Sequence, residues 1–130
     1  KAVRWALEIS DQVTDYRAAR AAVAEQFKGM SGVHTLNNLC LTIWGTLIGE
    51  GNVTKTLSQT VAMGLDNDCT TATAGSVAGA LCGLSGVEEH WTRRFHNKVY
   101  TYLNGHRQFQ IDEVAERFAA LAGQGYCKQQ

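Results

Sequence analysis

The chain of 130 residues contains no proline. Average usage would place about six or seven prolines in this length. Proline breaks helix interiors because it lacks a backbone donor, so a chain without it can consist mostly of long helices. The apolar fraction of 45% is typical of a globular protein, and the length corresponds to about one domain. These features favour a single helical domain.

Apolar residues recur with the helical period wherever they form a pattern, and no segment alternates clearly as a strand would. The strongest pattern runs from Thr35 to Ile48, where the apolar side chains are Leu36, Leu39, Cys40, Ile43, Trp44, Leu47 and Ile48. The other expected helices are Lys1–Ile9, Asp15–Lys28, a helix from N-cap Asn52 to Gly64, Thr70–Leu84, one or two short helices within Val87–Tyr102, and a helix from N-cap Asp112 to C-cap Gly123. We expect a turn at Asn104–Gly105 and a frayed tail over residues 124–130. We expect Val3, Ala6 and Leu7 to face inward from the first helix, and Phe118 and Leu121 from the last one. The expected fold is all-α, in one compact unit or in part of one.

The expected helix Thr70–Leu84 carries glycine at every fourth position, at Gly75, Gly79 and Gly83. Each glycine costs about 1 kcal/mol in a helix interior. Such a stripe therefore indicates close backbone approach by a neighbouring helix, which would place this element at the centre of a bundle.

Composition excludes several classes of protein. The 12 basic and 12 acidic residues balance, which argues against the broad basic surface of a nucleic-acid-binding protein. No apolar run approaches the length of a membrane span, and no signal peptide opens the chain, so we expect a cytoplasmic protein with reduced cysteines, Cys40 and Cys82 among them in the core. The charged fraction of 18% is low, which favours self-association or burial against other protein.

Two carboxylates, Asp66 and Asp68, precede the glycine-lined helix. Such neighbours raise each other's pKa unless a cation lies between them, and a hard dication such as magnesium, manganese or calcium suits oxygen ligands. Alternatively, Asp68 caps a helix that begins near Cys69 while Asp66 responds to the helix dipole. An EF-hand is excluded because its sixth and twelfth positions would be Thr71 and Val77 rather than Gly and Glu.

The segments Gly64–Asp68 and Ala74–Gly83 together resemble the C-terminal signature of the ADP-ribosylglycohydrolase family, G-x-D-x-D-[TC] followed by A-G-x-x-x-G-A-x-x-G. The flanking segments Val33–Asn38 and Val87–Trp91 resemble the regions around that signature, with Glu88 where proline is common. The resemblance thus extends from about Val33 to Trp91.

This resemblance implies a compact orthogonal helical bundle and a magnesium-dependent hydrolase that cleaves ADP-ribose from a protein or another acceptor at the ribose C1″. The family uses two magnesium ions, and manganese is an alternative. Asp66 and Asp68 correspond to metal ligands. Cys69 stands where the family often has threonine, and a thiol is a poor magnesium ligand, so Thr70 is a candidate substitute.

Three residues at the start of the apolar helix are candidates for the substrate cleft: His34, Asn37 and Asn38. The alternative is that Thr35 caps this helix and both asparagines face solvent. Farther along, Trp91, Arg93, Arg94 and His96 form either an aromatic-basic patch for a phosphate or a solvated helix face with one buried tryptophan.

The family's remaining metal ligands lie in an N-terminal Thr/Ser-Asp-Asp motif, and its acidic catalytic residue lies in the same half. The chain contains no Asp-Asp pair. We therefore expect residues 1–130 to be the C-terminal part of one helical domain, carrying half of a metal site, inactive alone and pairing with an N-terminal half or with itself. The alternatives are a non-catalytic relative that serves as a binding or structural protein, and a helical interaction domain in which the aspartates are only caps.

Overall fold

The computed structural model describes residues 1–127, with side chains to residue 125. The chain divides into two compact units, Lys1–Glu88 and a second from Glu89 onward. That both belong to the C-terminal part of one domain stays a prediction. Within the described residues, none of the helices is both long enough and apolar enough to cross a membrane.

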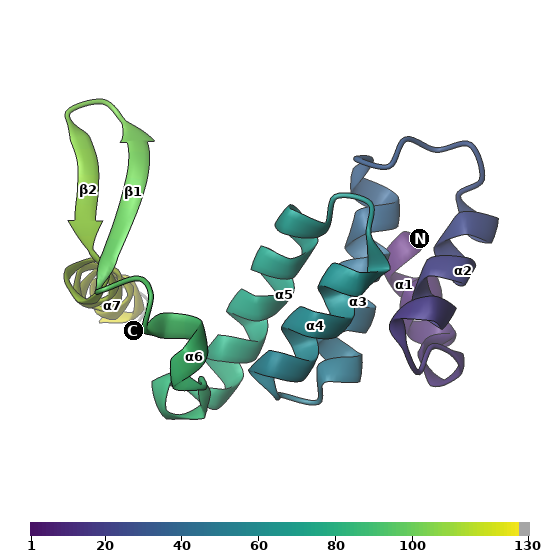
Figure 1. The fold of residues 1–130 in the computed structure, drawn as a ribbon, viewed down its shortest axis with the longest axis horizontal. Helices are drawn as coiled ribbons and strands as arrows, with labels where there is room; N and C mark the ends of the chain where they lie inside the picture. The colour runs from purple at the N-terminus through teal and green to yellow at the C-terminus, as the bar shows by residue number, and fades with distance from the viewer. Residues whose placement is uncertain (128–130) are drawn as a thin grey trace. The chain divides into compact units, whose positions relative to one another are not determined.

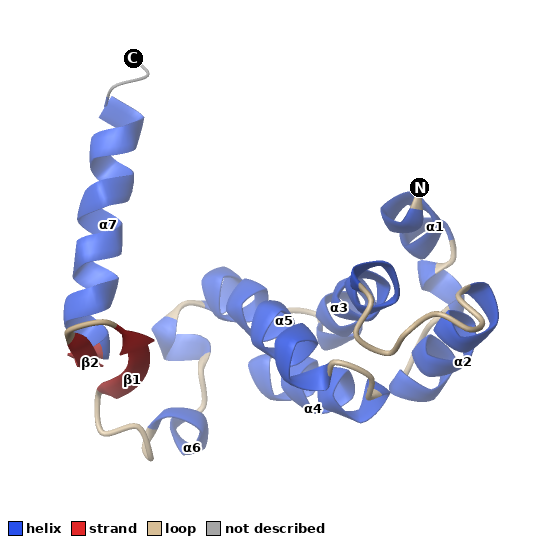
Figure 2. Ribbon diagram, turned by 90° about the horizontal axis from the view of Figure 1, so that it is seen from above, coloured by secondary structure: helices blue, strands red, loops and turns tan. Residues whose placement is uncertain are grey.

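The first unit is entirely helical, as the sequence predicted (Figure 1). Its α-helices are α1 (Ala2–Glu8), α2 (Tyr16–Gln26), α3 (Thr35–Gly49), α4 (Val53–Met63) and α5 (Asn67–Cys82). Short 3-10 turns lie at Ser10–Gln12 and Leu84–Gly86. Helix α3 packs against the other four helices, and Figure 2 shows α3, α4 and α5 side by side.

The core lies around α3. Trp44 packs edge-on against Trp5, with ring centroids 5.4 Å apart, and its indole nitrogen donates to the Ala6 carbonyl at 2.8 Å. The strongest predicted stripe is confirmed at Trp44, Cys40 and Ile48, which are buried. Leu36 and Leu47 of that stripe are exposed, and Leu41 outside it is fully buried. The predicted inward face of α1 is likewise confirmed at Ala6 and wrong at Val3 and Leu7.

Helices α3 and α4 approach through two glycine–threonine contacts. A Cβ on Gly45 would overlap the side chain of Thr60, and a Cβ on Gly49 would overlap Thr56. Both threonines are fully buried, and their hydroxyls donate to carbonyls one turn earlier in α4. The backbones of the two helices can therefore come close only because residues 45 and 49 lack side chains.

The glycine stripe of α5 behaves differently from the prediction. At Gly75 a Cβ would lie 2.7 Å from Leu57 Cδ2 of α4, which is the end of a side chain rather than the backbone of the neighbouring helix. Gly79 faces open space, and Gly83 lies beyond the helix with φ of +69°. The close approach of neighbouring helices thus depends more on Gly45 and Gly49, which the sequence reading did not single out.

The second unit contains α6 (Glu89–Thr92), β1 (Lys98–Leu103), β2 (His106–Gln110) and α7 (Ile111–Cys127). The strands form an antiparallel hairpin with Val99 opposite Phe109, and the predicted turn at Asn104–Gly105 connects them. The expectation of one or two short helices within Val87–Tyr102 is therefore confirmed by α6 and wrong from Lys98 onward, where β1 begins. β-Branched and aromatic residues beside an Asn-Gly pair favour a hairpin instead. Residues 93–97 form turns, so the helix-face interpretation of Arg93 and Arg94 is also wrong.

Helix α7 begins at Ile111 and continues to Cys127. Asp112 thus lies in the first turn rather than at the N-cap, and Gly123 does not end the helix. The predicted frayed tail is helical over residues 124–127, while residues 128–130 lie outside the described residues. Phe118 and Leu121, which we expected to be buried, are exposed.

Candidate metal centre

The candidate site lies at the start of α5. The helix begins at Asn67, which places Asp66 at the N-cap position and Asp68 in the first turn. The alternative that Asp68 is the N-cap is therefore wrong. The side chain of Asp66 makes no capping hydrogen bond either, so its carboxylate is not committed to holding the helix end. The helix dipole favours both negative charges at this end.

The local geometry brings three side chains together. One ligand atom each from Asp66, Asp68 and Cys69 lies within 4.8 Å of the other two. Asp66 is half-buried, whereas Asp68 and Cys69 are exposed. A hydrogen bond with Asp66 is the main cause that raises the pKa of the Cys69 thiol, and the negative charges of Asp66 and Asp68 raise it further. The cluster therefore concentrates negative charge at one point of the surface.

Asn38 anchors this cluster to α3. Its side chain is 7% exposed, and its amide nitrogen donates to the carbonyls of Gly32 at 2.7 Å and His34 at 3.0 Å. Its amide oxygen accepts from the backbone N–H of Asp66 at 3.2 Å. A single buried amide thus connects the loop before α3 to the residue that starts α5.

The other residues proposed for the substrate cleft have structural partners. Asn37 is 2% exposed and donates to the Ser31 carbonyl, so the prediction that both asparagines face solvent is wrong. His34, not Thr35, caps α3, because its Nδ1 accepts from the Leu36 N–H at 3.1 Å. Contact of these residues with a substrate stays a prediction.

A cavity of about 250 Å³ lies beside the cluster, between α3 and α5. Asp66, Cys69 and Thr70 line it from α5 and its N-cap, and Asn38 and Thr42 line it from α3. The Thr70 side chain is buried, and its hydroxyl donates to the Asn67 carbonyl at 3.4 Å. The site thus places two carboxylates and a thiol beside a small hollow whose surface is largely apolar.

The fold and this cluster define an all-α protein with carboxylates gathered at a helix N-terminus. The model of the family described as ADP-ribosylglycohydrolase matches residues 1–127, and the chain belongs to this family. The match extends well beyond the signature on both sides and suggests hydrolase activity in general. No curated protein and no solved structure matches the chain.

Proposed function

We propose that the protein is a magnesium-dependent hydrolase that removes ADP-ribose from a protein or another acceptor, and that this chain supplies one side of its metal site. Family membership supports the class of reaction. The observation that carries the metal site is the convergence of Asp66, Asp68 and Cys69 within 4.8 Å. The absence of a capping hydrogen bond from the Asp66 carboxylate supports it further, because a residue that only capped α5 would bond to a backbone N–H.

The donor set fits magnesium or manganese in part. Asp66 and Asp68 would hold the cation, since hard dications prefer carboxylate oxygens. The Cys69 thiol does not suit magnesium, and its hydrogen bond with Asp66 gives it the role of orienting that carboxylate instead. Thr70 stays a candidate ligand, because its hydroxyl donates to the Asn67 carbonyl and so keeps its oxygen lone pairs for a cation. When bound, magnesium supplies positive charge that orients ribose hydroxyls and polarises water.

The chain's own residues would prepare the site for an anionic substrate. Asn38 holds the Asp66 backbone in place, and the N-terminus of α5 provides a positive dipole end that suits a pyrophosphate. The cavity between α3 and α5 would admit part of the ligand. His34, Asn37 and Asn38 would then act by shaping this region.

Calorimetry on the full-length protein tests the metal site. Magnesium and manganese should bind to the wild type, and Asp66→Asn or Asp68→Asn should weaken binding by at least about 100-fold, more than loss of an outer-shell partner causes. Asp11→Asn, which alters an acidic residue in a remote turn, is the control. ADP-ribose release from a modified protein should fall in the same variants. Absence of metal binding in the wild type would overturn the proposal.

A second candidate function is a non-catalytic relative that binds ADP-ribose without cleaving it. The observation that favours it is Cys69 in the position where the family often has threonine. Metal and ADP-ribose binding without hydrolysis by the full-length protein would select this alternative. Restored hydrolysis in Cys69→Thr would then identify the thiol as the cause.

A further inference from the structure

The neutral total charge conceals a basic segment in the second unit. Between His90 and Gln110 there is no Asp or Glu, whereas Arg93, Arg94, Lys98 and Arg107 contribute four positive charges. The rest of the chain consequently carries four more acidic than basic residues. We call residues 90–110 the basic hairpin segment.

These four charges are available to a partner. All four side chains are exposed, and none of them forms a salt bridge within the described part of the chain. The acidic residues of α7 begin at Asp112, just beyond the hairpin. No ion pair among the described residues therefore neutralises the charge of the basic hairpin segment.

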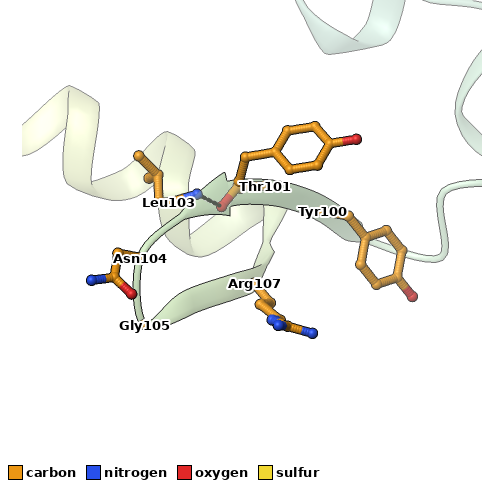
Figure 3. Close-up of a pocket in the computed structure, with 7 residues that line it drawn as sticks. Tyr100, Thr101, Leu103, Asn104, Gly105 and Arg107 are labelled. Atoms are coloured by element: carbon orange, nitrogen blue, oxygen red, sulfur yellow. Dashed lines mark hydrogen bonds between the residues drawn. The ribbon is translucent and has the colours of Figure 1, made fainter.

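Exposed aromatic side chains alternate with these charges along the segment. Phe95, Tyr100 and Tyr102 are well exposed. Tyr100 and Tyr102 of β1 and Arg107 of β2 line one open cavity of about 810 Å³ at the hairpin turn, together with Asn104. Figure 3 shows the Tyr100 ring and the Arg107 guanidinium projecting away from the ribbon. Two large rings and one cation thus share the accessible surface at the hairpin turn, and Lys98 lines a second hollow of the same unit together with Phe95.

We propose that the basic hairpin segment binds single-stranded nucleic acid. Proteins that bind single strands combine cations that follow the phosphates with aromatic rings on which bases stack, and both are present. The six residues of β1 span about 20 Å, a length that faces several phosphates spaced at roughly 3.4 Å along a stacked strand. An acidic peptide would use the cations alone and leave the rings in water.

Fluorescence anisotropy with a labelled oligothymidylate tests the proposal on the full-length protein. We expect a dissociation constant in roughly the micromolar range at low salt, and a slope of log K against log salt near about −3 for four phosphate contacts. Lys98→Ala with Arg107→Ala should reduce this slope by about 1.4. Tyr100→Ala with Tyr102→Ala should weaken binding by about tenfold or more without changing the slope.

Matched controls lie outside the segment. Arg17→Ala with Arg20→Ala removes the same charge from α2, and Phe118→Ala removes an exposed ring from α7. Both should bind as the wild type does. No binding by the wild type at low salt, equal losses in the controls, or displacement of the oligonucleotide by polyglutamate at equal charge would each overturn the proposal. Binding to phosphatidylserine vesicles in preference to the oligonucleotide would overturn it in favour of a membrane surface. The wild-type measurements decide the question even where a variant fails to fold.

Discussion

Replacing Asn38 with alanine should destabilise the first unit and loosen the metal site together. The change removes the donor to the Gly32 carbonyl and the acceptor of the Asp66 N–H. The His34 carbonyl keeps a partner, because the Asn38 backbone also donates to it. Two backbone groups thus lose their hydrogen bonds. Each unsatisfied buried group costs about 1–3 kcal/mol, and since both bonds are part-buried, about 1–1.5 kcal/mol applies to each. We expect a loss of about 2–3 kcal/mol.

Urea denaturation followed by tryptophan fluorescence measures this loss, because Trp5 and Trp44 lie in the same core. With a slope of about 2 kcal/mol per molar urea, the midpoint should fall by about 1 M or slightly more. Asn67→Ala is the control, since its side chain makes a single exposed hydrogen bond to the Val61 carbonyl, and its midpoint should hardly move. Magnesium affinity should fall in Asn38→Ala by about tenfold, as for other supporting residues of metal sites. Equal midpoints for the two variants would refute the reasoning.

Three further predictions follow from the helix packing and the cluster. Gly45→Ala should lower the free energy of unfolding by about 1–3 kcal/mol, because its Cβ overlaps Thr60. In urea denaturation, the double variant Gly45→Ala with Thr60→Ala should regain part of this free energy. Gly79→Ala should instead raise stability by up to about 1 kcal/mol, since nothing lies within 4 Å of its Cβ and alanine favours the helix; a loss in the same denaturation assay would contradict the open space. Without metal, an alkylating reagent should react slowly with Cys69 at pH 8, because the raised pKa of the thiol leaves less thiolate at that pH. Asp66→Asn should speed this reaction, as measured by mass spectrometry of the modified peptide. An unchanged rate in Asp66→Asn would contradict the conclusion that Asp66 raises the pKa.

The sequence predicted the helices of the first unit because their apolar spacing and caps are local signals. Asn52 caps α4 as expected, and its Oδ1 accepts from the Lys55 N–H at 2.7 Å. Which side of each helix is buried depends on the neighbours, which a single helix does not specify. Leu47 is consequently exposed while Leu41 is buried.

The hairpin was missed although its signal is present. Val99, Tyr100 and Thr101 are β-branched or aromatic, and Asn104–Gly105 follows them. The turn was predicted, but the residues before it were expected to be helical because helical periodicity dominates the rest of the chain, and no element was predicted for His106–Gln110. A two-residue Asn-Gly connection between such runs is a stronger indication than short-range periodicity.

At the candidate site, the sequence identified Asp66 and Asp68 because two carboxylates so close together are unusual. The anchoring role of Asn38 could not be predicted, since its bond to the Asp66 N–H joins residues 28 positions apart. Burial of the Asn38 side chain can be predicted only when the position of the loop before α3 is known, because carbonyls of that loop accept its hydrogen bonds. The cap role of His34 was missed because histidine is an uncommon N-cap residue.

Gly45 contacts Thr60 and Gly49 contacts Thr56, so a step of four residues forward in α3 corresponds to a step of four residues backward in α4. The two contacts therefore define the register of two antiparallel helices. In homologous chains, a larger side chain at one of these α3 positions should therefore occur together with a smaller side chain at the opposite α4 position. Such covariation would provide a register for aligning distant sequences, even where the aspartates have changed.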